Sequence, residues 1–322
     1  MFEKECLNVK QILVIIDYDQ SYIDKIQKLA PDYEIVTDVD EADFNAVQIV
    51  IGWDKALVDV LKSNNHQIKW IQLQSAGADK VPQELLKEQN IILTSSSGMH
   101  SKVIAESIIG MMLGHTRQLF KSHNEQVKNK WAQDEMSLST LENKTLAIVG
   151  IGKIGAQTAK IAKAFEMNVI GVNRSGRDVQ NVDQIFVQED VAKAVSEADY
   201  VVNILPLTDE TTGFFNLDLF NHFKEGAAFI NVGRGSSVVT DDLLEALDSD
   251  QLSYAALDVF EEEPLDEDHP LWNHDKVLIT PHIAGHMEDY IGTLFPIIEE
   301  NLSAYVKNQE VVLNKIDFEK HY

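Results

Sequence analysis

Three side chains in the second half of the sequence have the chemical types needed to polarise and protonate a carbonyl group. Arg234 lies between two glycines after an apolar run, and its guanidinium group offers a fork of donors suited to a carboxylate or an α-keto acid. His282 follows a proline after another apolar run, where an imidazole is a good candidate for a general acid. Glu263 could orient that ring and favour its charged form. Each of the three also fits an ordinary exposed turn, so the residue types alone leave that alternative open.

A glycine-rich segment at residues 146–155 has the spacing of a dinucleotide site. Its sequence, LAIVGIGKIG, runs from an apolar strand into Gly-x-Gly-x-x-Gly, and a helical pattern follows. In such a site the first glycine makes the turn, the second lets the backbone approach a pyrophosphate, and the third lets the helix pack on the sheet. The start of the helix adds unpaired N–H groups for the phosphates. We therefore predict cofactor contacts at Gly150, Gly152, Lys153, Ile154 and Gly155.

The end of the next predicted strand departs from the pattern of an NAD site. Such a site needs a carboxylate about twenty residues past the glycines to bind the ribose hydroxyls, and Asn173 stands there instead. Arg174, Ser175 and Arg177 add two positive charges and a hydroxyl donor, although the net charge of the chain is −25. These residues favour NADP(H) as the preferred cofactor, with NAD(H) as a second option. The alternative is an exposed turn whose arginines offset an acidic surface.

Alternating short strands and helices must position these residues. We expect two sets of strands, at residues 11–17, 33–37, 47–51, 68–73 and 91–94 and at residues 146–149, 169–172, 200–204, 228–232, 255–257 and 277–280. Strands that alternate with helices imply parallel sheets, which bind ligands at the carboxyl ends of their strands. Apolar positions at helical spacing predict one long helix over residues 101–127 and another over 289–306. The predicted fold class is α/β, with two Rossmann-like doubly wound parallel-sheet domains and a cleft between them.

Charge and composition exclude several classes of partner. The 322-residue chain has 27 basic and 52 acidic residues, a balance that repels nucleic acid and anionic lipid. No apolar stretch is long enough to cross a membrane, and the first residues lack the basic start and apolar core of a signal peptide. The single cysteine, Cys6, excludes an intrachain disulfide and fits a reducing cytoplasm. We expect a cytoplasmic protein that binds a small molecule, with no metal site, no nucleic acid and no membrane.

The chain resembles the D-isomer-specific 2-hydroxyacid dehydrogenases over nearly its whole length. The stretches that carry the resemblance are residues 74–79, 94–106, 146–155, 205–208, 230–235, 257–264 and 281–285. The resemblance implies that Arg234 binds and polarises the keto acid, that His282 donates a proton to its carbonyl oxygen, and that Glu263 is the partner of His282. It also implies a flavodoxin-like, substrate-binding domain at residues 1–98 and 288–322 and a dinucleotide-binding Rossmann domain at residues 99–287.

The same resemblance implies further contacts. Backbone N–H groups of Ser75, Ala76 and Gly77 would bind the substrate carboxylate, and Asp258 would hold the nicotinamide carboxamide. The remaining cofactor contacts that it implies are Leu205, Pro206, Thr211, Val232, Gly233, His282 and Gly285. The family is usually dimeric, so we expect a homodimer formed through the predicted helix at 101–127 and the segment near Trp131.

One segment indicates a branch of the family, and two other functions remain as alternatives. Residues 238–244, VVTDDLL, stand where many members have Val-Asp, and they look like the glyoxylate/hydroxypyruvate reductase branch. We therefore expect NADP(H)-dependent reduction of a small 2-keto acid, glyoxylate or hydroxypyruvate. A 3-phosphoglycerate dehydrogenase-like enzyme is one alternative, although Lys69, Lys80 and Lys102 are too scattered to predict a site for a substrate phosphate. A dinucleotide-sensing corepressor of the C-terminal-binding protein type is the other, and the absence of long disordered tails argues against it.

Overall fold

The computed structural model describes residues 9–78 and 81–318, and the chain divides into two compact units. One unit comprises Met1–Met99 with Glu288–Tyr322, and the other comprises His100–Met287. Cys6, Asp79 and Lys80 lie outside the described residues. Within the described part of the chain, no helix has the length and apolar character needed to cross a membrane.

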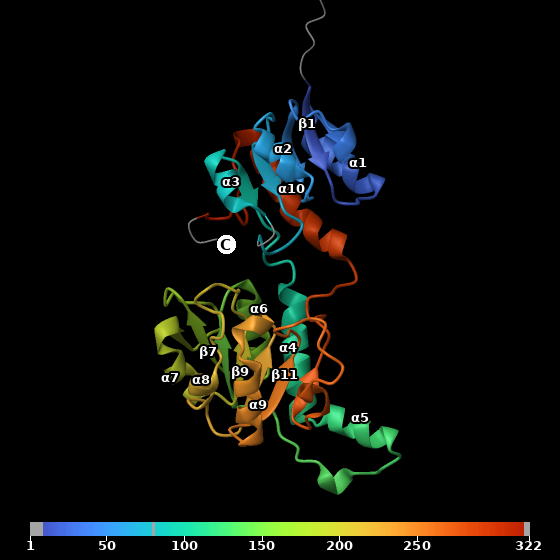
Figure 1. Cartoon of the computed structure of the whole chain (residues 1–322). Helices are drawn as coiled ribbons and strands as arrows, with labels where there is room; N and C mark the ends of the chain where they lie inside the picture. The colour runs from blue at the N-terminus through green and yellow to red at the C-terminus, as the bar shows by residue number, and fades with distance from the viewer. Residues whose placement is uncertain (1–8, 79–80, 319–322) are drawn as a thin grey trace, which may run out of the picture. The chain divides into compact units, whose positions relative to one another are not determined.

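The first unit is built on a five-stranded parallel sheet with the order β2-β1-β3-β4-β5. Its strands are β1 (Lys10–Val14), β2 (Tyr33–Val36), β3 (Val47–Ile51), β4 (Trp70–Gln72) and β5 (Ile92–Thr94). Its helices are α1 (Gln20–Leu29), α2 (Leu57–Ser63), α3 (Gln83–Glu88) and α10 (Tyr290–Asn308), and α1 packs against α10 (Figure 1). This strand order is that of flavodoxin-like sheets.

The second unit is built on a seven-stranded parallel sheet with the order β12-β11-β10-β9-β6-β7-β8. Its strands are β6 (Thr145–Val149), β7 (Asn168–Asn173), β8 (Gln184–Val187), β9 (Tyr200–Asn203), β10 (Ala227–Asn231), β11 (Leu252–Leu257) and β12 (Val277–Ile279). The chain reverses direction across the sheet between β6 and β9, which is the Rossmann arrangement. Both sheets confirm the predicted fold class of two doubly wound parallel-sheet units.

Helices cover both faces of the seven-stranded sheet. On one face, α4 (Ser101–Thr116) and α6 (Lys153–Ala164) pack against strand side chains such as Ile148 and Val202. On the other face, α7 (Val191–Ser196), α8 (Leu217–Phe220) and α9 (Thr240–Asp248) enclose a cluster around Phe229. The central strands β6, β9 and β10 are mostly apolar because both of their faces are buried. Short 3-10 turns occur at Val39–Glu41, Gln133–Glu135, Gln188–Asp190, Gly235–Ser237 and Pro270–Asn273.

The prediction of one helix over residues 101–127 is wrong. The structure has two helices there, α4 and α5 (Leu119–Val127), because Gln118 adopts the left-handed conformation with φ +52°. The turn brings the Phe120 ring against Gly114, where a Cβ atom would overlap the ring. Neither glycine nor proline marks the break, so the helical periodicity continues through it in the sequence. The edge strand β8 was not predicted either, because its apolar run is only three residues long, Ile185–Val187, and is only half-buried.

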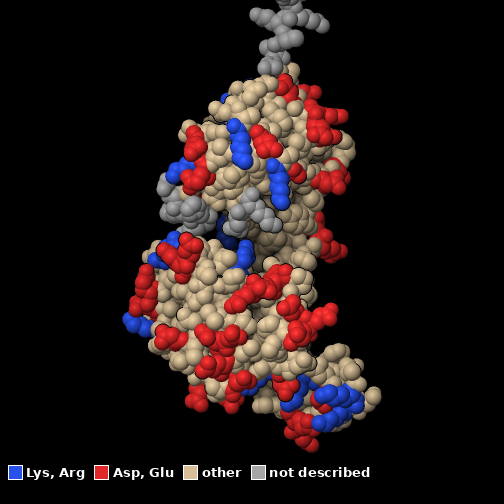
Figure 2. Space-filling model, viewed as in Figure 1, with Lys and Arg blue, Asp and Glu red and all other residues tan. Residues whose placement is uncertain are grey.

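The surface is acidic on the face shown in Figure 2. Asp and Glu side chains are spread over both units there, and Lys and Arg are fewer. This distribution matches the 52 acidic and 27 basic residues of the sequence. A binding site for an anion therefore needs positive groups of its own.

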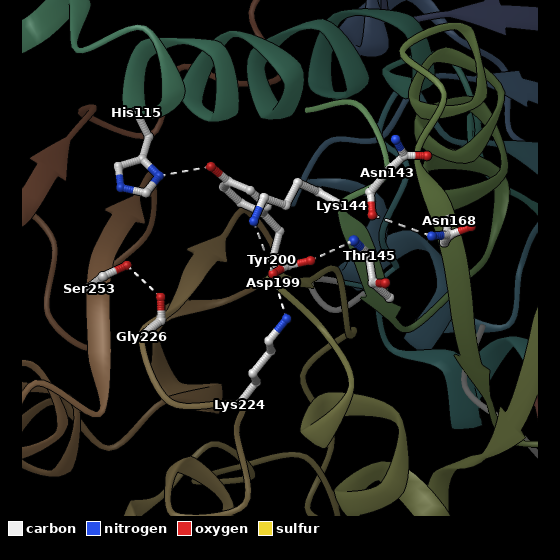
Figure 3. A network of polar contacts seen from close by, with 10 residues as sticks. All are labelled: His115, Asn143, Lys144, Thr145, Asn168, Asp199, Tyr200, Lys224, Gly226 and Ser253. Carbon is white, nitrogen blue, oxygen red and sulfur yellow. Dashed lines mark hydrogen bonds and ion pairs between the residues drawn. The ribbon is translucent and has the colours of Figure 1, made fainter. Parts of the chain in front are cut away.

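A polar network occupies the amino-terminal edge of the seven-stranded sheet (Figure 3). The Asp199 carboxylate accepts hydrogen bonds from the Thr145 backbone N–H at 2.9 Å and from the Lys224 ammonium at 2.7 Å. Burial opposes ionisation of Asp199, but these donors and the Lys144 charge outweigh it, and the pKa of the carboxyl is lowered. At the same edge, His115 Nδ1 and the Tyr200 hydroxyl lie 2.8 Å apart. These contacts join the starts of the strands, so this edge is structural and the opposite edge carries the predicted site residues.

Candidate functional site

The predicted site residues of the second unit gather at the carboxyl ends of its strands. Each follows or ends a different strand: Gly150 after β6, Asn173 in β7, Leu205 after β9, Val232 after β10, Asp258 after β11 and His282 after β12. Parallel strands bring these ends to one edge of the sheet, which is where doubly wound sheets bind ligands. The sequence could indicate this edge because every segment is an apolar run followed by polar or glycine residues.

The glycine loop has the shape that a dinucleotide pyrophosphate requires. Gly150 has φ +90°, and a Cβ there would lie 2.9 Å from the Ile204 carbonyl, so only glycine fits this turn. A Cβ at Gly155 would lie 2.8 Å from the Ile151 side chain, beneath α6. At Gly152, by contrast, a Cβ would meet only one protein atom, at 4.0 Å. Neighbouring protein atoms therefore leave space beside Gly152 at the start of α6, and the phosphate contact there stays a prediction.

The loop after β7 is organised by the side chain of Asn173. Its Oδ1 accepts the backbone N–H groups of Ser175 at 3.1 Å and Arg177 at 3.2 Å, and its Nδ2 donates to the Arg177 carbonyl at 2.9 Å. Arg174 forms an ion pair with Glu210 at 3.2 Å, and both side chains are exposed. An exposed pair of this kind is worth about 0–1 kcal/mol. A charge-assisted bond to a phosphate is worth about 1.5–3 kcal/mol, so the Glu210 contact does not prevent Arg174 from binding one.

Buried amide groups that the sequence analysis did not identify hold the loop of Arg234. Asn203 and Asn231 end neighbouring strands, and Asn203 Nδ2 donates to Asn231 Oδ1 at 2.9 Å and to the Ser237 hydroxyl at 2.7 Å. Asn231 Oδ1 also accepts the Gly233 N–H at 3.1 Å, and the Ser237 hydroxyl donates to the Arg234 carbonyl at 2.6 Å. All three supporting side chains are buried. The signal that could have revealed them is a polar residue at the end of an otherwise apolar strand.

The glycines beside Arg234 permit close backbone packing rather than flexibility. A Cβ at Gly233 would lie 2.9 Å from the Leu205 carbonyl oxygen, and a Cβ at Gly235 would overlap the Phe260 carbonyl. The Arg234 loop therefore lies directly against the loops that follow β9 and β11. The Arg234 side chain itself is exposed at this edge, where its guanidinium group is accessible to an anionic ligand.

His282 and Glu263 form the hydrogen-bonded pair that the sequence predicts. His282 Nδ1 lies 2.7 Å from Glu263 Oε2, and since a carboxylate only accepts, Nδ1 carries the proton. Glu263 Oε1 accepts the Phe260 backbone N–H at 3.0 Å. Burial opposes ionisation of Glu263, but the hydrogen bonds from His282 and Phe260 and the nearby charges of His282 and Arg234 outweigh it, so the pKa of its carboxyl is lowered. The imidazole is thereby oriented with Nε2 as the atom left for a ligand.

Asp258 fixes the backbone on both sides of His282. Its buried carboxylate accepts the Thr280 hydroxyl at 2.6 Å and the backbone N–H groups of Ile283 at 2.9 Å and Ala284 at 3.0 Å. The contact with the nicotinamide carboxamide that the resemblance implies stays a prediction. Asp258 also has a structural role, because two of the three groups that donate hydrogen bonds to its carboxylate are the backbone amides directly after His282.

The remaining predicted residues lie in two other loops. Leu205, Pro206 and Thr211 follow β9, and the buried Thr211 hydroxyl donates to the Pro206 carbonyl at 2.7 Å, which shapes that loop. Ser75, Ala76 and Gly77 follow β4 in the first unit, are exposed, and include a hydrogen bond from the Ser75 hydroxyl to the Gly77 carbonyl at 2.7 Å. Their proposed role with a substrate carboxylate stays a prediction.

Comparison with known proteins gives matches over both units. A family model described as the NAD-binding domain of D-isomer-specific 2-hydroxyacid dehydrogenases matches residues 109–284, and a model described as the catalytic domain matches residues 12–196. A D-lactate dehydrogenase of Streptococcus agalactiae serotype V is 34% identical over 289 residues, which cover 85% of this chain and 86% of that protein. A glyoxylate/hydroxypyruvate reductase A of Serratia proteamaculans is 33% identical over 230 residues, which cover 69% of this chain and 72% of that protein.

Solved structures are similar over nearly the whole chain. One is an NADPH-dependent glyoxylate/hydroxypyruvate reductase from Sinorhizobium meliloti, in complex with NADP and sulfate. Its TM-score is 0.78 at 26% identity, and the match covers 97% of this chain and all of that one. The similarity therefore extends over both units described above.

Proposed function

Because the chain belongs to the D-isomer-specific 2-hydroxyacid dehydrogenases, which are NAD(P)-dependent oxidoreductases, we propose that it reduces a small 2-keto acid, glyoxylate or hydroxypyruvate, with NADPH. The observation that carries the proposal is the 2.7 Å pair of His282 and Glu263, at the strand edge that also holds Arg234 and the glycine loop. This edge combines a general acid, a cation and a fold that binds dinucleotides. Reduction of a 2-keto acid needs the acid to protonate the carbonyl oxygen and the cation to bind the carboxylate.

The proposal gives each side chain one role, supported by its chemical type and by the contacts described above. Arg234 binds the keto acid through its guanidinium fork and draws electron density toward the carbonyl oxygen. The nicotinamide, when bound, supplies the hydride for the carbonyl carbon. His282 gives its Nε2 proton to the carbonyl oxygen, because Nδ1 is held by Glu263. The carbonyl becomes a hydroxyl group, and Glu263 stabilises the charge of the imidazolium before the proton leaves.

A panel of keto acids tests this function. Wild-type protein should oxidise NADPH with glyoxylate or hydroxypyruvate faster than with phenylpyruvate or 3-phosphohydroxypyruvate. Preference for the phosphorylated acid would assign the chain to 3-phosphoglycerate chemistry instead. Preference for pyruvate would favour the activity that the name of the streptococcal relative states.

Replacing Glu263 by Gln should lower kcat for keto-acid reduction. The amide keeps the shape of the carboxylate, but it removes the negative charge beside His282 and one of the two oxygens that can accept the Nδ1 proton. We expect kcat at saturating NADPH and keto acid to fall by about tenfold or more. A kcat close to that of the wild type would show that Glu263 does not support the ring.

The cofactor preference is assigned to the loop after β7. Asn173 does not repel a 2′-phosphate as an aspartate would, and Arg174, Ser175 and Arg177 bring positive charge and a donor on a surface rich in acidic groups. The hydrogen bonds of Asn173 to Ser175 and Arg177 close the loop in which all three residues lie. We propose that they bind the 2′-phosphate of NADPH.

The kcat/KM of the wild type should be higher for NADPH than for NADH, by roughly tenfold or more for one retained phosphate contact. Arg174→Ala should lower this ratio. Asn173→Asp should reverse it, since the carboxylate keeps the acceptor for Ser175 and Arg177 but repels the phosphate. Equal values of kcat/KM for the two cofactors in the wild type would contradict the assignment.

A homodimer is proposed through α5 and the segment that follows it. This arm of the second unit, residues 119–138, extends away from the sheet of its own unit (Figure 1). It carries several exposed apolar side chains, including Val127 at 70% and Trp131 at 90%. Single exposed apolar residues are ordinary, but a group of large ones on one arm is typical of an interface.

Light scattering at micromolar protein should give twice the chain mass of 36.2 kDa. Trp131→Glu should lower the measured mass toward that of one chain, because a charge would be buried in the interface. A wild-type mass of 36.2 kDa at every concentration would contradict the dimer.

A further inference from the structure

The backbone of His282 is in a conformation that its surroundings must maintain. Its φ is +54°, in the left-handed region, which a residue with a Cβ adopts uncommonly. Such a backbone conformation persists where contacts from neighbouring residues hold it in place. Asp258 supplies these contacts on one side of the 282–285 segment.

Helix α4 supplies contacts on the other side of the same segment. His100 Nδ1 lies 2.9 Å from the Gly285 carbonyl oxygen, and the Ser107 hydroxyl donates to the Ala284 carbonyl at 3.3 Å. Because a carbonyl oxygen only accepts, the Nδ1 atom of His100 carries the proton. His100 directly precedes α4 and Ser107 lies two turns later, so both side chains reach the segment from one face of the helix. Residues of α4 thus hold two carbonyls of the segment, and Asp258 holds two of its amides.

We propose that His100, assisted by Ser107, is a positioning residue for the reaction: it holds the 282–285 segment so that the His282 ring stays aligned with the carbonyl oxygen of the substrate. The proposal rests on the proposed role of His282 as proton donor. Neither His100 nor Ser107 touches the reacting atoms in this account. They act through the backbone that carries His282, as Asp258 does from β11.

The chain offers matched variants that separate positioning from ordinary stability. In His100→Asn the side-chain N–H lies close to the place of Nδ1–H and can still donate to Gly285, whereas His100→Leu removes the donor. At the far end of the same helix, His115 Nδ1 lies 2.8 Å from the Tyr200 hydroxyl (Figure 3). Its ring also stacks on Tyr254, with 4.3 Å between ring centroids. His115→Phe keeps the stacked ring and loses the hydrogen bond, so it is the control for a purely structural defect of α4.

The experiment measures kcat, KM, NADPH binding by fluorescence, Tm and hydrogen exchange of the peptide that contains residues 282–285. His100→Leu should lower kcat by about ten- to a hundredfold, because small displacements of a reacting group are costly. Its NADPH affinity should fall much less than kcat, because the glycine loop and the loop after β7 are unchanged, and exchange of the 282–285 peptide should become faster. His100→Asn should stay close to wild type in both readouts. His115→Phe should lower Tm without lowering kcat or changing that peptide.

Three results would overturn the proposal. The first is a kcat of His100→Leu close to that of the wild type, with unchanged hydrogen exchange. The second is a loss of kcat in His100→Asn as large as that in His100→Leu. The third is a loss of kcat in His115→Phe as large as that in His100→Leu. An active His282→Gln variant would instead overturn the proposed role of His282. Hydrogen exchange reports on the 282–285 segment without a substrate, so it tests the contact even if every keto acid fails to react.

Discussion

Replacing His282 with Gln is expected to lower the turnover number for keto-acid reduction by roughly 10²–10⁴-fold, the usual contribution of a positioned general acid. Glutamine keeps a polar side chain of similar reach, but its amide does not give up a proton at neutral pH. The measurement is kcat at saturating NADPH and keto acid, with NADPH affinity measured separately.

NADPH affinity should barely change in this variant, because the glycine loop and the loop after β7 are left intact. A turnover number within tenfold of the wild type would show that another group donates the proton. Loss of NADPH binding together with turnover would point to a collapsed loop, which hydrogen exchange of the 282–285 peptide would reveal.

Replacing Arg234 with Lys is the second large change that we expect. A lysine ammonium is a point charge, and it cannot reproduce the fork of donors that a guanidinium group presents to a carboxylate. We expect kcat/KM for the keto acid to fall by about a hundredfold or more, at the scale of removing a group that stabilises developing charge. Near-normal kinetics would mean that Arg234 is only an exposed turn residue.

The backbone near Arg234 explains why lysine is the informative substitution. Gly233, Gly235 and the buried amides of Asn203 and Asn231 hold this loop against its neighbours. The guanidinium adds only one hydrogen bond to this loop, from Nη1 to the Gly233 carbonyl at 2.9 Å, so Arg234→Lys should leave Tm close to that of the wild type. A large drop in Tm would assign the loss of activity to folding instead.

The binding edge of the sheet and its main residues could be predicted from the sequence, because each of them is marked by a short local pattern. The motif around Gly150, the residue types of Arg234 and His282, and the apolar runs before them can be read within ten residues. Parallel pairing then brings separate segments to one edge, so the pairing of Glu263 with His282 could be predicted once both were placed after strands.

The parts that the sequence did not reveal depend on contacts between distant segments. Asn203 supports a loop 28 residues away, and His100 reaches Gly285 across 185 residues. Neither side chain has a local signal that separates it from any other polar residue. The break between α4 and α5 was missed for the same reason, because it depends on the packing of Phe120 on Gly114 and not on a helix-breaking residue.

The central claim is that the chain couples oxidation of NADPH to formation of a 2-hydroxy acid through His282. It is tested most directly by measuring NADPH consumed and hydroxy acid formed in one reaction with glyoxylate or hydroxypyruvate, for wild type and His282→Gln side by side. We expect equal amounts of NADPH consumed and hydroxy acid formed in the wild type, and almost none of either in the variant over the same time. Oxidation of NADPH without hydroxy acid, or equal yields from the two proteins, would contradict the account.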